Sequence, residues 1–164
     1  MMPDYVEVFF NALKQKQELD SVINDFLKKS ENFKESKAFL DYLEKMESGF
    51  PNFENEERTG GIIIHKKLAG DIEEIFGELY EAKFPIDKIR LIDEYGNSDE
   101  LSMEDNNTYA FSVRPKTGKK SFSKHAYGFA VDINPVQNPY IKNNVIEPKN
   151  SIDYLDRKSI RKGM

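Results

Sequence analysis

The strongest constraint on this chain is a histidine placed seven residues before an aspartate within an apolar stretch. His125 and Asp132 both lie in the segment 121–140. A continuous helix would separate them by about 10 Å of rise, and a continuous strand would place them on opposite faces because the offset is odd. If the two side chains meet, the chain must bend between them. Gly128 can supply that bend, since glycine adopts a positive φ at little cost.

The residues after this bend alternate as in a strand. Phe129, Val131 and Ile133 fall on one face, and the smaller or polar residues of 130–134, Asp132 among them, fall on the other. The alternation predicts an apolar face directed at the core and an opposite face that carries the carboxylate. A half-buried carboxylate is costly unless it is paired. We therefore expect Asp132 to have a partner.

Two interpretations of this aspartate are open. In the first, Asp132 caps a turn or pairs with a lysine such as Lys124, and His125 is an ordinary surface histidine. In the second, His125 and Asp132 bind one metal ion, which needs ligating atoms about 3 to 4 Å apart. One His and one Asp form a weak motif, so their spacing by itself favours the first. The chain has no cysteine, so a metal site would have to use histidine and carboxylate ligands.

A longer motif favours the second interpretation. It reads Ser123-x-His125-x-x-Gly128-x-Ala130-x-Asp132-Ile133-Asn134-Pro135. This segment resembles the signature of the zinc D-alanyl-D-alanine carboxypeptidase family. It continues into Asn138-Pro139-Tyr140, as in the branch of VanY-type carboxypeptidases and phage L-alanyl-D-glutamate endopeptidases. Residues 81–86 and 102–114 resemble the same branch, and the resemblance covers approximately residues 60–164.

The resemblance implies roles for four residues. His125 and Asp132 would be two of the three protein ligands of a catalytic zinc ion. Arg114 would stabilise the substrate carboxylate or the oxyanion, a task suited to its planar guanidinium. Ser123 would lie in the substrate pocket. Without the resemblance, Arg114 would be interpreted as an exposed edge arginine, and Ser123 equally well as a turn-stabilising hydroxyl.

One part of the family pattern is missing. The family's third zinc ligand is a histidine and its general base a Glu or Asp, both in a later [ED]-x-x-H block, whereas this sequence has no histidine after Asp132. The other histidine, His65, follows Ile62–Ile64, and we interpret it as a surface residue at a strand end. The hypothesis that fits is a family member truncated at its C-terminus.

The function implied is that of a bacterial or phage hydrolase. As a zinc metallopeptidase, it would cut peptidoglycan stem peptides, either as a D-alanyl-D-alanine carboxypeptidase or as an L-alanyl-D-glutamate endopeptidase. The family resemblance places it at the cell envelope or outside the cell, although no signal peptide opens the sequence. The alternatives are a non-catalytic remnant that binds wall peptide or a protein partner, and a purely structural domain. The oligomeric state does not follow from the sequence.

Charge is distributed unevenly along the chain. Residues 1–110 contain 13 basic and 25 acidic side chains, and residues 111–164 contain 11 basic and 4 acidic ones. A basic surface near the site would favour an anionic substrate. Nucleic acid is a weaker alternative, because the lysines around Gly118 do not alternate with stacking aromatics. A solvated lysine-rich loop explains the pattern equally well.

Apolar periodicity predicts one domain of the α+β class with no transmembrane span. Residues 1–59 are predicted to be a helical N-terminal region, with the last helical stripe at Phe39–Met46 and a connector at Gly49–Gly61. Residues 60–164 form the predicted core, with a helix at Leu68–Lys83 ended by Pro85. Strands are expected at 62–64, 86–92 and 109–114, and a loop at 102–108. In the strand at 109–114, the odd-numbered residues would face the core. The resemblance implies a Hedgehog/DD-peptidase-like fold, a small mostly antiparallel sheet lacking the final strand or strands.

Overall fold

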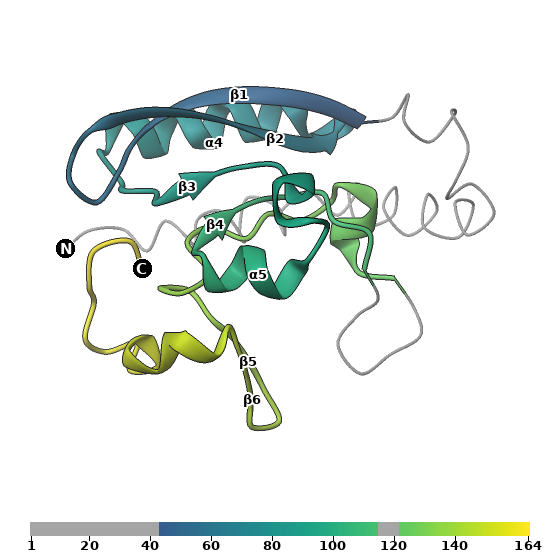
Figure 1. Cartoon of the computed structure of the whole chain (residues 1–164). Helices are drawn as coiled ribbons and strands as arrows, with labels where there is room; N and C mark the ends of the chain where they lie inside the picture. The colour runs from purple at the N-terminus through teal and green to yellow at the C-terminus, as the bar shows by residue number, and fades with distance from the viewer. Residues whose placement is uncertain (1–42, 115–121) are drawn as a thin grey trace.

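The computed structural model describes residues 43–114 and 122–164. Within them it has an α+β architecture (Figure 1). The first unit is an antiparallel hairpin of β1 (Leu43–Pro51) and β2 (Glu57–His65), in which Leu43 pairs with His65 and Pro51 with Glu57. The helix α4 (Ala69–Glu81) follows a single 3-10 turn, η1 (Lys66–Leu68), and packs along β1.

Helix α4 confirms the prediction from residues 68–83. Its buried side chains are Ile72, Phe76 and Leu79, which lie at helical spacing and face the hairpin. The apolar side chains of β2 complete the contact, since Ile62 and Ile64 are also buried. The strand predicted at 62–64 is therefore present, and it extends over nine residues.

The helical stripe predicted at Phe39–Met46 is wrong for its described part, because Leu43 and Met46 lie in β1. The connector predicted at Gly49–Gly61 is likewise mostly strand. The physical reason is the pairing of β1 with β2, which no local period reports. The predicted boundary between residues 59 and 60 falls inside β2. Residues 1–42, where the rest of the predicted helical region lies, are outside the described residues.

The middle of the chain contains two short strands that pair in parallel. Strand β3 (Lys88–Ile89) pairs with β4 (Asn107–Thr108), and between them come the 3-10 turn η2 (Ile92–Tyr95) and helix α5 (Asp99–Glu104). The strand predicted at 86–92 is thus short, and the loop predicted at 102–108 begins inside a helix. Ser98 caps α5, with its hydroxyl accepting a hydrogen bond of 3.2 Å from the amide of Leu101.

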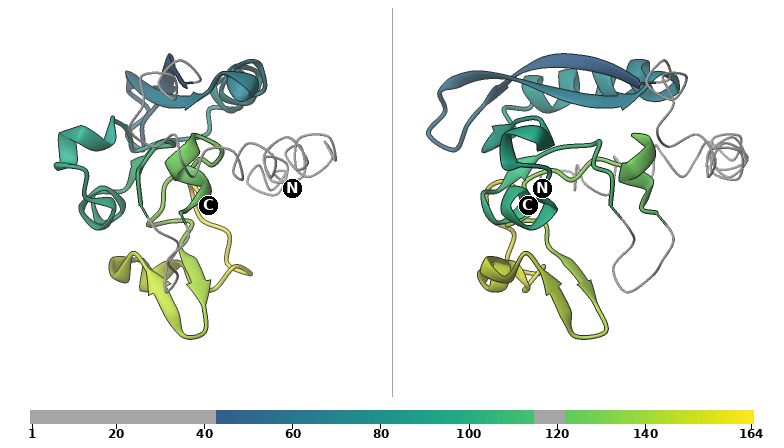
Figure 2. Two further views of the ribbon diagram at one scale, coloured as in Figure 1. Left: turned by 90° about the vertical axis from the view of Figure 1, so that its right-hand side faces the viewer. Right: turned by 45° about the vertical axis from the view of Figure 1, so that its right-hand side comes forward.

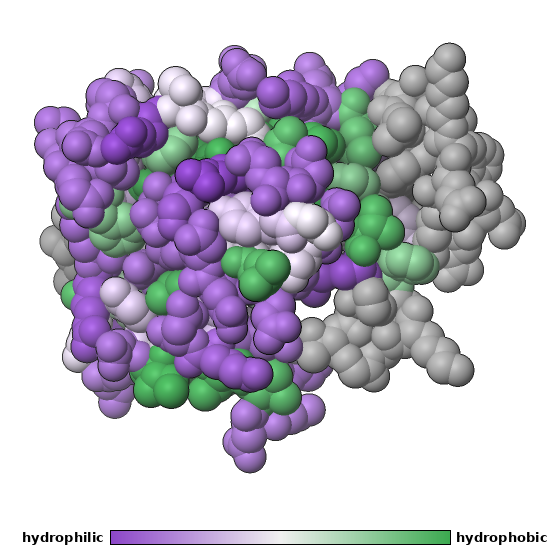
Figure 3. Space-filling model, viewed as in Figure 1, coloured by the Kyte–Doolittle hydropathy of each residue, from purple (hydrophilic) through white to green (hydrophobic). Residues whose placement is uncertain are grey.

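The last part of the described chain contains the 3-10 turn η3 (Lys124–Tyr127), the hairpin β5 (Tyr140–Lys142) with β6 (Val145–Glu147), and η4 (Lys149–Tyr154). Both views of Figure 2 show the β5–β6 hairpin at the end of the molecule opposite β1 and β2. The face in Figure 3 mixes hydrophilic and apolar residues. No helix among the described residues has both the length and the apolar character needed to span a membrane.

The prediction of one small sheet carrying the site needs correction. The described residues form three separate two-stranded sheets, one of them parallel. Arg114, His125 and Asp132 lie outside the named strands, and one isolated antiparallel bridge joins Tyr109 to Asp132. The main core lies between α4, β2 and residues 126–131, so these site segments lie at its edge. The Hedgehog/DD-peptidase-like topology stays a prediction.

Candidate functional site

The bend that brings His125 toward Asp132 is formed by η3 and Gly128. Ser123 precedes η3, and its hydroxyl accepts a hydrogen bond of 3.4 Å from the amide of His125. Gly128 ends the turn with φ +70°, and its amide donates to the His125 carbonyl at 3.1 Å. The predicted position of the bend and the predicted conformation of Gly128 are both confirmed.

The two ring nitrogens of His125 face different partners, and Nε2 is the one that points toward Asp132. Nδ1 lies 2.6 Å from the carbonyl oxygen of Ala110, and because a carbonyl only accepts, Nδ1 carries a proton and donates. Nε2 lies 3.2 Å from Oδ2 of Asp132. A neutral imidazole would then present a lone pair to a carboxylate, which is repulsive. The geometry therefore requires either a proton or a cation between these two atoms.

In the metal-free protein the proton serves this purpose. Burial by itself lowers the pKa of His125, but the charge and hydrogen bond of Asp132 outweigh it, so the pKa is raised above its ordinary value. For Asp132, burial acts to raise the pKa, and the charge and hydrogen bond of His125 hold it below the usual range. The pair is thus an ion pair whose proton a metal ion could replace.

Asp132 is positioned by its backbone. Its amide donates to the Tyr109 carbonyl at 2.9 Å, and its carbonyl accepts from the Tyr109 amide at 3.1 Å. Its side chain is 33% exposed, so a ligand can approach it. The predicted apolar face is also confirmed, since Phe129 and Val131 are buried and Ile133 packs against the core. The structure pairs Asp132 with His125 and with Arg114, and not with Lys124.

Arg114 is a partly buried residue of the site, not an exposed edge arginine. Its Nε lies 2.8 Å from Oδ1 of Asp99, and its Nη2 lies 3.9 Å from Oδ2 of Asp132. The alternation predicted for residues 109–114 is confirmed only in part: Phe111 packs against the core, but Val113 is 63% exposed while Ser112 is buried. Among the described residues the segment has one bridge and belongs to no named strand, so no strand ladder maintains a period of two there.

Two residues of this cluster were not predicted to be there. Tyr109 was expected only in the core, yet its hydroxyl donates to Oδ1 of Asp99. The Tyr109 ring also stacks on His125, with 5.4 Å between ring centroids. The available signals were modest. Ser98 followed by two acidic residues is typical of a helix start, and a buried tyrosine hydroxyl needs a partner.

His65 is buried, and its prediction as a surface residue is wrong. It is 1% exposed, its Nδ1 accepts from the Lys67 amide at 3.2 Å, and its ring stacks on Phe129 at 4.4 Å. Among the described residues, no group of three His, Cys, Asp or Glu could hold a metal ion. His65 therefore does not join His125 and Asp132 as a third ligand.

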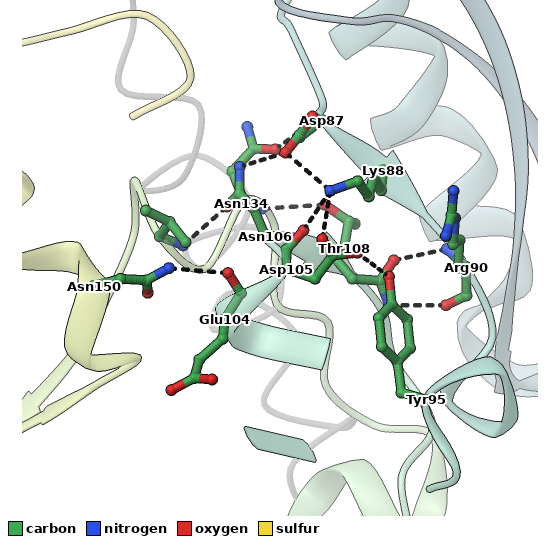
Figure 4. Close-up of polar contacts among 12 residues, drawn as sticks. Asp87, Lys88, Arg90, Tyr95, Glu104, Asp105, Asn106, Thr108, Asn134 and Asn150 are labelled. Carbon is green, nitrogen blue, oxygen red and sulfur yellow. Dashed lines mark hydrogen bonds and ion pairs between the residues drawn. The ribbon is translucent and has the colours of Figure 1, made fainter. Parts of the chain in front are cut away.

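Asn106 and Asn107 lie where the loop after α5 enters β4, and Figure 4 shows the surroundings of Asn106. The Asn107 side-chain amide donates to the Arg90 carbonyl at 3.0 Å, and that of Asn106 donates to Oδ2 of Asp87 at 3.2 Å. Beside them, the Lys88 ammonium binds Oδ1 of Asp105 at 2.8 Å. The side-chain amides of both asparagines are therefore used in hydrogen bonds within the protein.

The described site fits two ligands of a divalent cation. Nε2 of His125 and Oδ2 of Asp132 are 3.2 Å apart, within the separation of two atoms that share an ion. The Ala110 carbonyl holds the other ring nitrogen, as metal-binding histidines usually require. With His125 neutral, the two carboxylates of Asp99 and Asp132 exceed the charge of Arg114, which leaves a net negative site. A third protein ligand is not grouped with them in the described residues.

Two hollows in the described residues lie elsewhere. One of about 480 Å³ is lined by Tyr80, Phe76 and residues of β1 and β2, and one of about 260 Å³ lies between β1 and α4. Neither contains a residue of the His125–Asp132 cluster. Both hollows are lined by residues of α4, whereas the charged side chains of the candidate site converge beside η3. Lys116, Lys119 and Lys120, which the charge analysis singled out, lie outside the described residues, and Lys124 is exposed.

A comparison with protein families finds one matching model. It is described as D-alanyl-D-alanine carboxypeptidase, and it matches residues 117–162. The match includes Ser123, His125 and Asp132 and ends before the last two residues. It does not include Arg114 or Asp99. Neither a search of curated proteins nor a search of solved structures finds a match to this chain.

Proposed function

We propose that this protein is a zinc-dependent peptidase acting on peptidoglycan stem peptides, because residues 117–162 match the family model described as D-alanyl-D-alanine carboxypeptidase. The observation that carries the proposal is the 3.2 Å between Nε2 of His125 and Oδ2 of Asp132. The cleaved bond is that of a terminal D-alanyl-D-alanine or of L-alanyl-D-glutamate. Such a substrate belongs to the cell envelope or the extracellular space.

His125 and Asp132 are the proposed zinc ligands. The hydrogen bond from Nδ1 of His125 to Ala110 leaves the lone pair of Nε2 for a metal ion. A bound zinc ion supplies a Lewis acid that activates water and polarises a carbonyl group. Two protein ligands bind zinc weakly, so the complete site needs a further ligand beyond those grouped in the described residues.

Arg114 and Ser123 are the proposed substrate contacts. The guanidinium of Arg114 lies beside the pair, where it can bind a substrate carboxylate or the negative charge that develops on the scissile carbonyl. The hydroxyl of Ser123 caps η3 as an acceptor, which leaves its own proton for donation to a peptide. The turn-stabilising role of Ser123 is the observed one, and the substrate contact is an addition to it.

A second candidate function is a non-catalytic protein that binds wall peptide or a protein partner. It is favoured by one observation, the lack of a three-residue metal cluster in the described part of the chain. In this function Arg114 would bind a carboxylate without any bond being cut. Zinc affinity and turnover distinguish the two.

Calorimetric zinc titration at neutral pH tests the proposed ligands. We expect the wild type to bind zinc, and we expect the variants His125→Ala and Asp132→Ala to lose this binding. His65→Asn is the matched control, because it removes the other histidine of the chain and replaces Nδ1 with an oxygen that can accept from Lys67. Loss of zinc binding in His65→Asn but not in His125→Ala would contradict the assignment.

Incubation with zinc and muropeptides, followed by mass spectrometry, tests the activity. Released D-alanine identifies a carboxypeptidase, and stems cut after L-alanine identify an endopeptidase. Muropeptides that are bound but never cut would favour the second candidate function. Arg114→Lys keeps the positive charge but loses the planar guanidinium that can donate two parallel hydrogen bonds. Under the proposed function this variant has lower turnover but still binds zinc.

A further inference from the structure

The guanidinium of Arg114 is held along one edge by a residue far away in the sequence. Oδ1 of Asp99, in the first turn of α5, lies 2.8 Å from Nε of Arg114. Both side chains are largely shielded from water, with 20% of Asp99 and 22% of Arg114 exposed. A shielded pair of this kind loses less to solvent screening than a surface ion pair.

Tyr109 fixes the same carboxylate from the other side. Its hydroxyl donates to Oδ1 of Asp99, the oxygen that also faces Arg114. Tyr109 is 1% exposed, its ring stacks on His125, and its backbone pairs with Asp132. The buried side chain of Tyr109 therefore connects Asp99 to the segments that carry His125 and Asp132.

This arrangement favours a positioning role for Asp99. A general base needs a free carboxylate oxygen facing the substrate, and Oδ1 of Asp99 is not free, because it is occupied by Tyr109 and Arg114. Without Asp99, the remaining described ion-pair partner of Arg114 is Asp132, whose Oδ2 is 3.9 Å from Nη2. Arg114 would then be free to move onto Asp132 and neutralise it.

We propose that Asp99 is a positioning residue, which together with Tyr109 holds the Nε edge of Arg114 so that its terminal nitrogens stay available to an anionic group beside the His125–Asp132 pair. The identity of that anion, a peptide carboxylate or a developing oxyanion, rests on the proposed function. The positioning is a property of the metal-free protein.

The test uses the full chain without zinc or peptide. Nitrogen-15 NMR follows the exchange with water of the arginine Nε proton, which Arg114→Lys assigns by its loss. In Asp99→Ala we expect this exchange to be at least about tenfold faster, because the carboxylate that forms the shielded ion pair with Nε is lost. Asp99→Asn keeps an acceptor without the charge and gives an intermediate rate.

Glu100→Ala is the matched control. Glu100 also lies in the first turn of α5, so its removal changes the helix terminus to the same extent, but its side chain is 72% exposed and its ion pair is with Lys149. We expect the Arg114 signal to be unchanged in this variant. An unchanged signal in Asp99→Ala, or an equal acceleration in Glu100→Ala, overturns the proposal.

A second measurement connects positioning to the ligand. With zinc present, N-acetyl-D-alanyl-D-alanine is titrated into the wild type and the variants. We expect Asp99→Ala to weaken the binding of this probe at least about tenfold. If the wild type binds neither zinc nor the probe, the proposed function fails, and the Nε exchange alone still decides whether Asp99 holds Arg114.

Discussion

The amide of His65 donates a hydrogen bond of 3.0 Å to the carbonyl of Gly128. The end of β2 is thus attached to the bend that carries His125, although the two residues are far apart in the sequence. The contact leaves no space at the bend. A Cβ at position 128 would lie 2.7 Å from the His65 nitrogen and 3.1 Å from the Ile64 carbonyl carbon.

Gly128→Ala should destabilise the protein by more than about 2 kcal/mol, because it adds a left-handed alanine and a clash with backbone that cannot move aside. Denaturant unfolding measures the change. Gly77→Ala is the control, since position 77 is exposed in the middle of α4 and a Cβ there meets nothing within 4 Å. That variant should be more stable than the wild type by roughly 0.5 to 1 kcal/mol. Equal stability of Gly128→Ala and the wild type would contradict the role of the bend.

His65 should make stability depend on pH below neutrality. Burial, and secondarily the charge of Lys67, lower the pKa of His65 from 6.5 to about 4. Between these two pH values His65 is protonated in the unfolded chain but remains neutral in the folded protein. The free energy of unfolding therefore falls as the pH is lowered from about 6.5 to 4. The contribution is about 3 kcal/mol in all.

Urea unfolding of the wild type and of His65→Asn between pH 7 and pH 4 isolates this effect. The carboxylates and His125 contribute to both proteins, so the difference between their slopes reports His65 alone. The wild type should lose more stability than the variant over this range. Parallel curves would show that His65 titrates normally in the folded protein.

Asp132→Asn should lower the pKa of His125 in the metal-free protein. The negative charge and the hydrogen bond of Asp132 raise that pKa, and asparagine removes the charge while burial still acts to lower it. Proton–carbon NMR titration of the histidine ring in the presence of a chelator measures the change. The ring of His65, observed in the same spectra, serves as the control and should titrate as in the wild type. An unchanged pKa of His125 would mean that the two side chains do not interact in solution.

Asn134→Ala should destabilise the protein by at least about 3 kcal/mol. Asn134 is fully buried, its Oδ1 accepts from the Asp87 amide at 3.0 Å, and its Nδ2 donates to the Pro85 carbonyl at 2.8 Å and the Gly163 carbonyl at 3.2 Å. Alanine leaves all three backbone groups without these partners.

Asn143→Ala separates this loss from backbone strain. Asn143 has φ 50° and Asn134 has φ 44°, so both substitutions place alanine in the left-handed region. Asn143 is exposed in the turn of the β5–β6 hairpin, and its replacement should cost only about 1 kcal/mol. Thermal or urea unfolding of both variants is the measurement, and similar losses would contradict a central role for the Asn134 amide.

Local sequence patterns were sufficient to predict several features of this protein. The bend at Gly128 follows from an odd spacing and from the conformational freedom of glycine. The apolar period of 68–83 specifies α4, and the alternation of 129–133 specifies which side chains enter the core. Each of these depends on residues that are neighbours in the sequence.

Other features depend on contacts between distant segments. Leu43 and Met46 lie at helical spacing but form a strand because β2 pairs with them. His65 is buried because the bend at Gly128 and the ring of Phe129 cover it. Asp99 reaches Arg114 only because α5 packs beside the segment that follows β4. A sequence motif specifies which side chains carry the chemistry. Long-range packing decides which of them meet, because an ion pair or a strand ladder needs a partner whose position no local pattern contains.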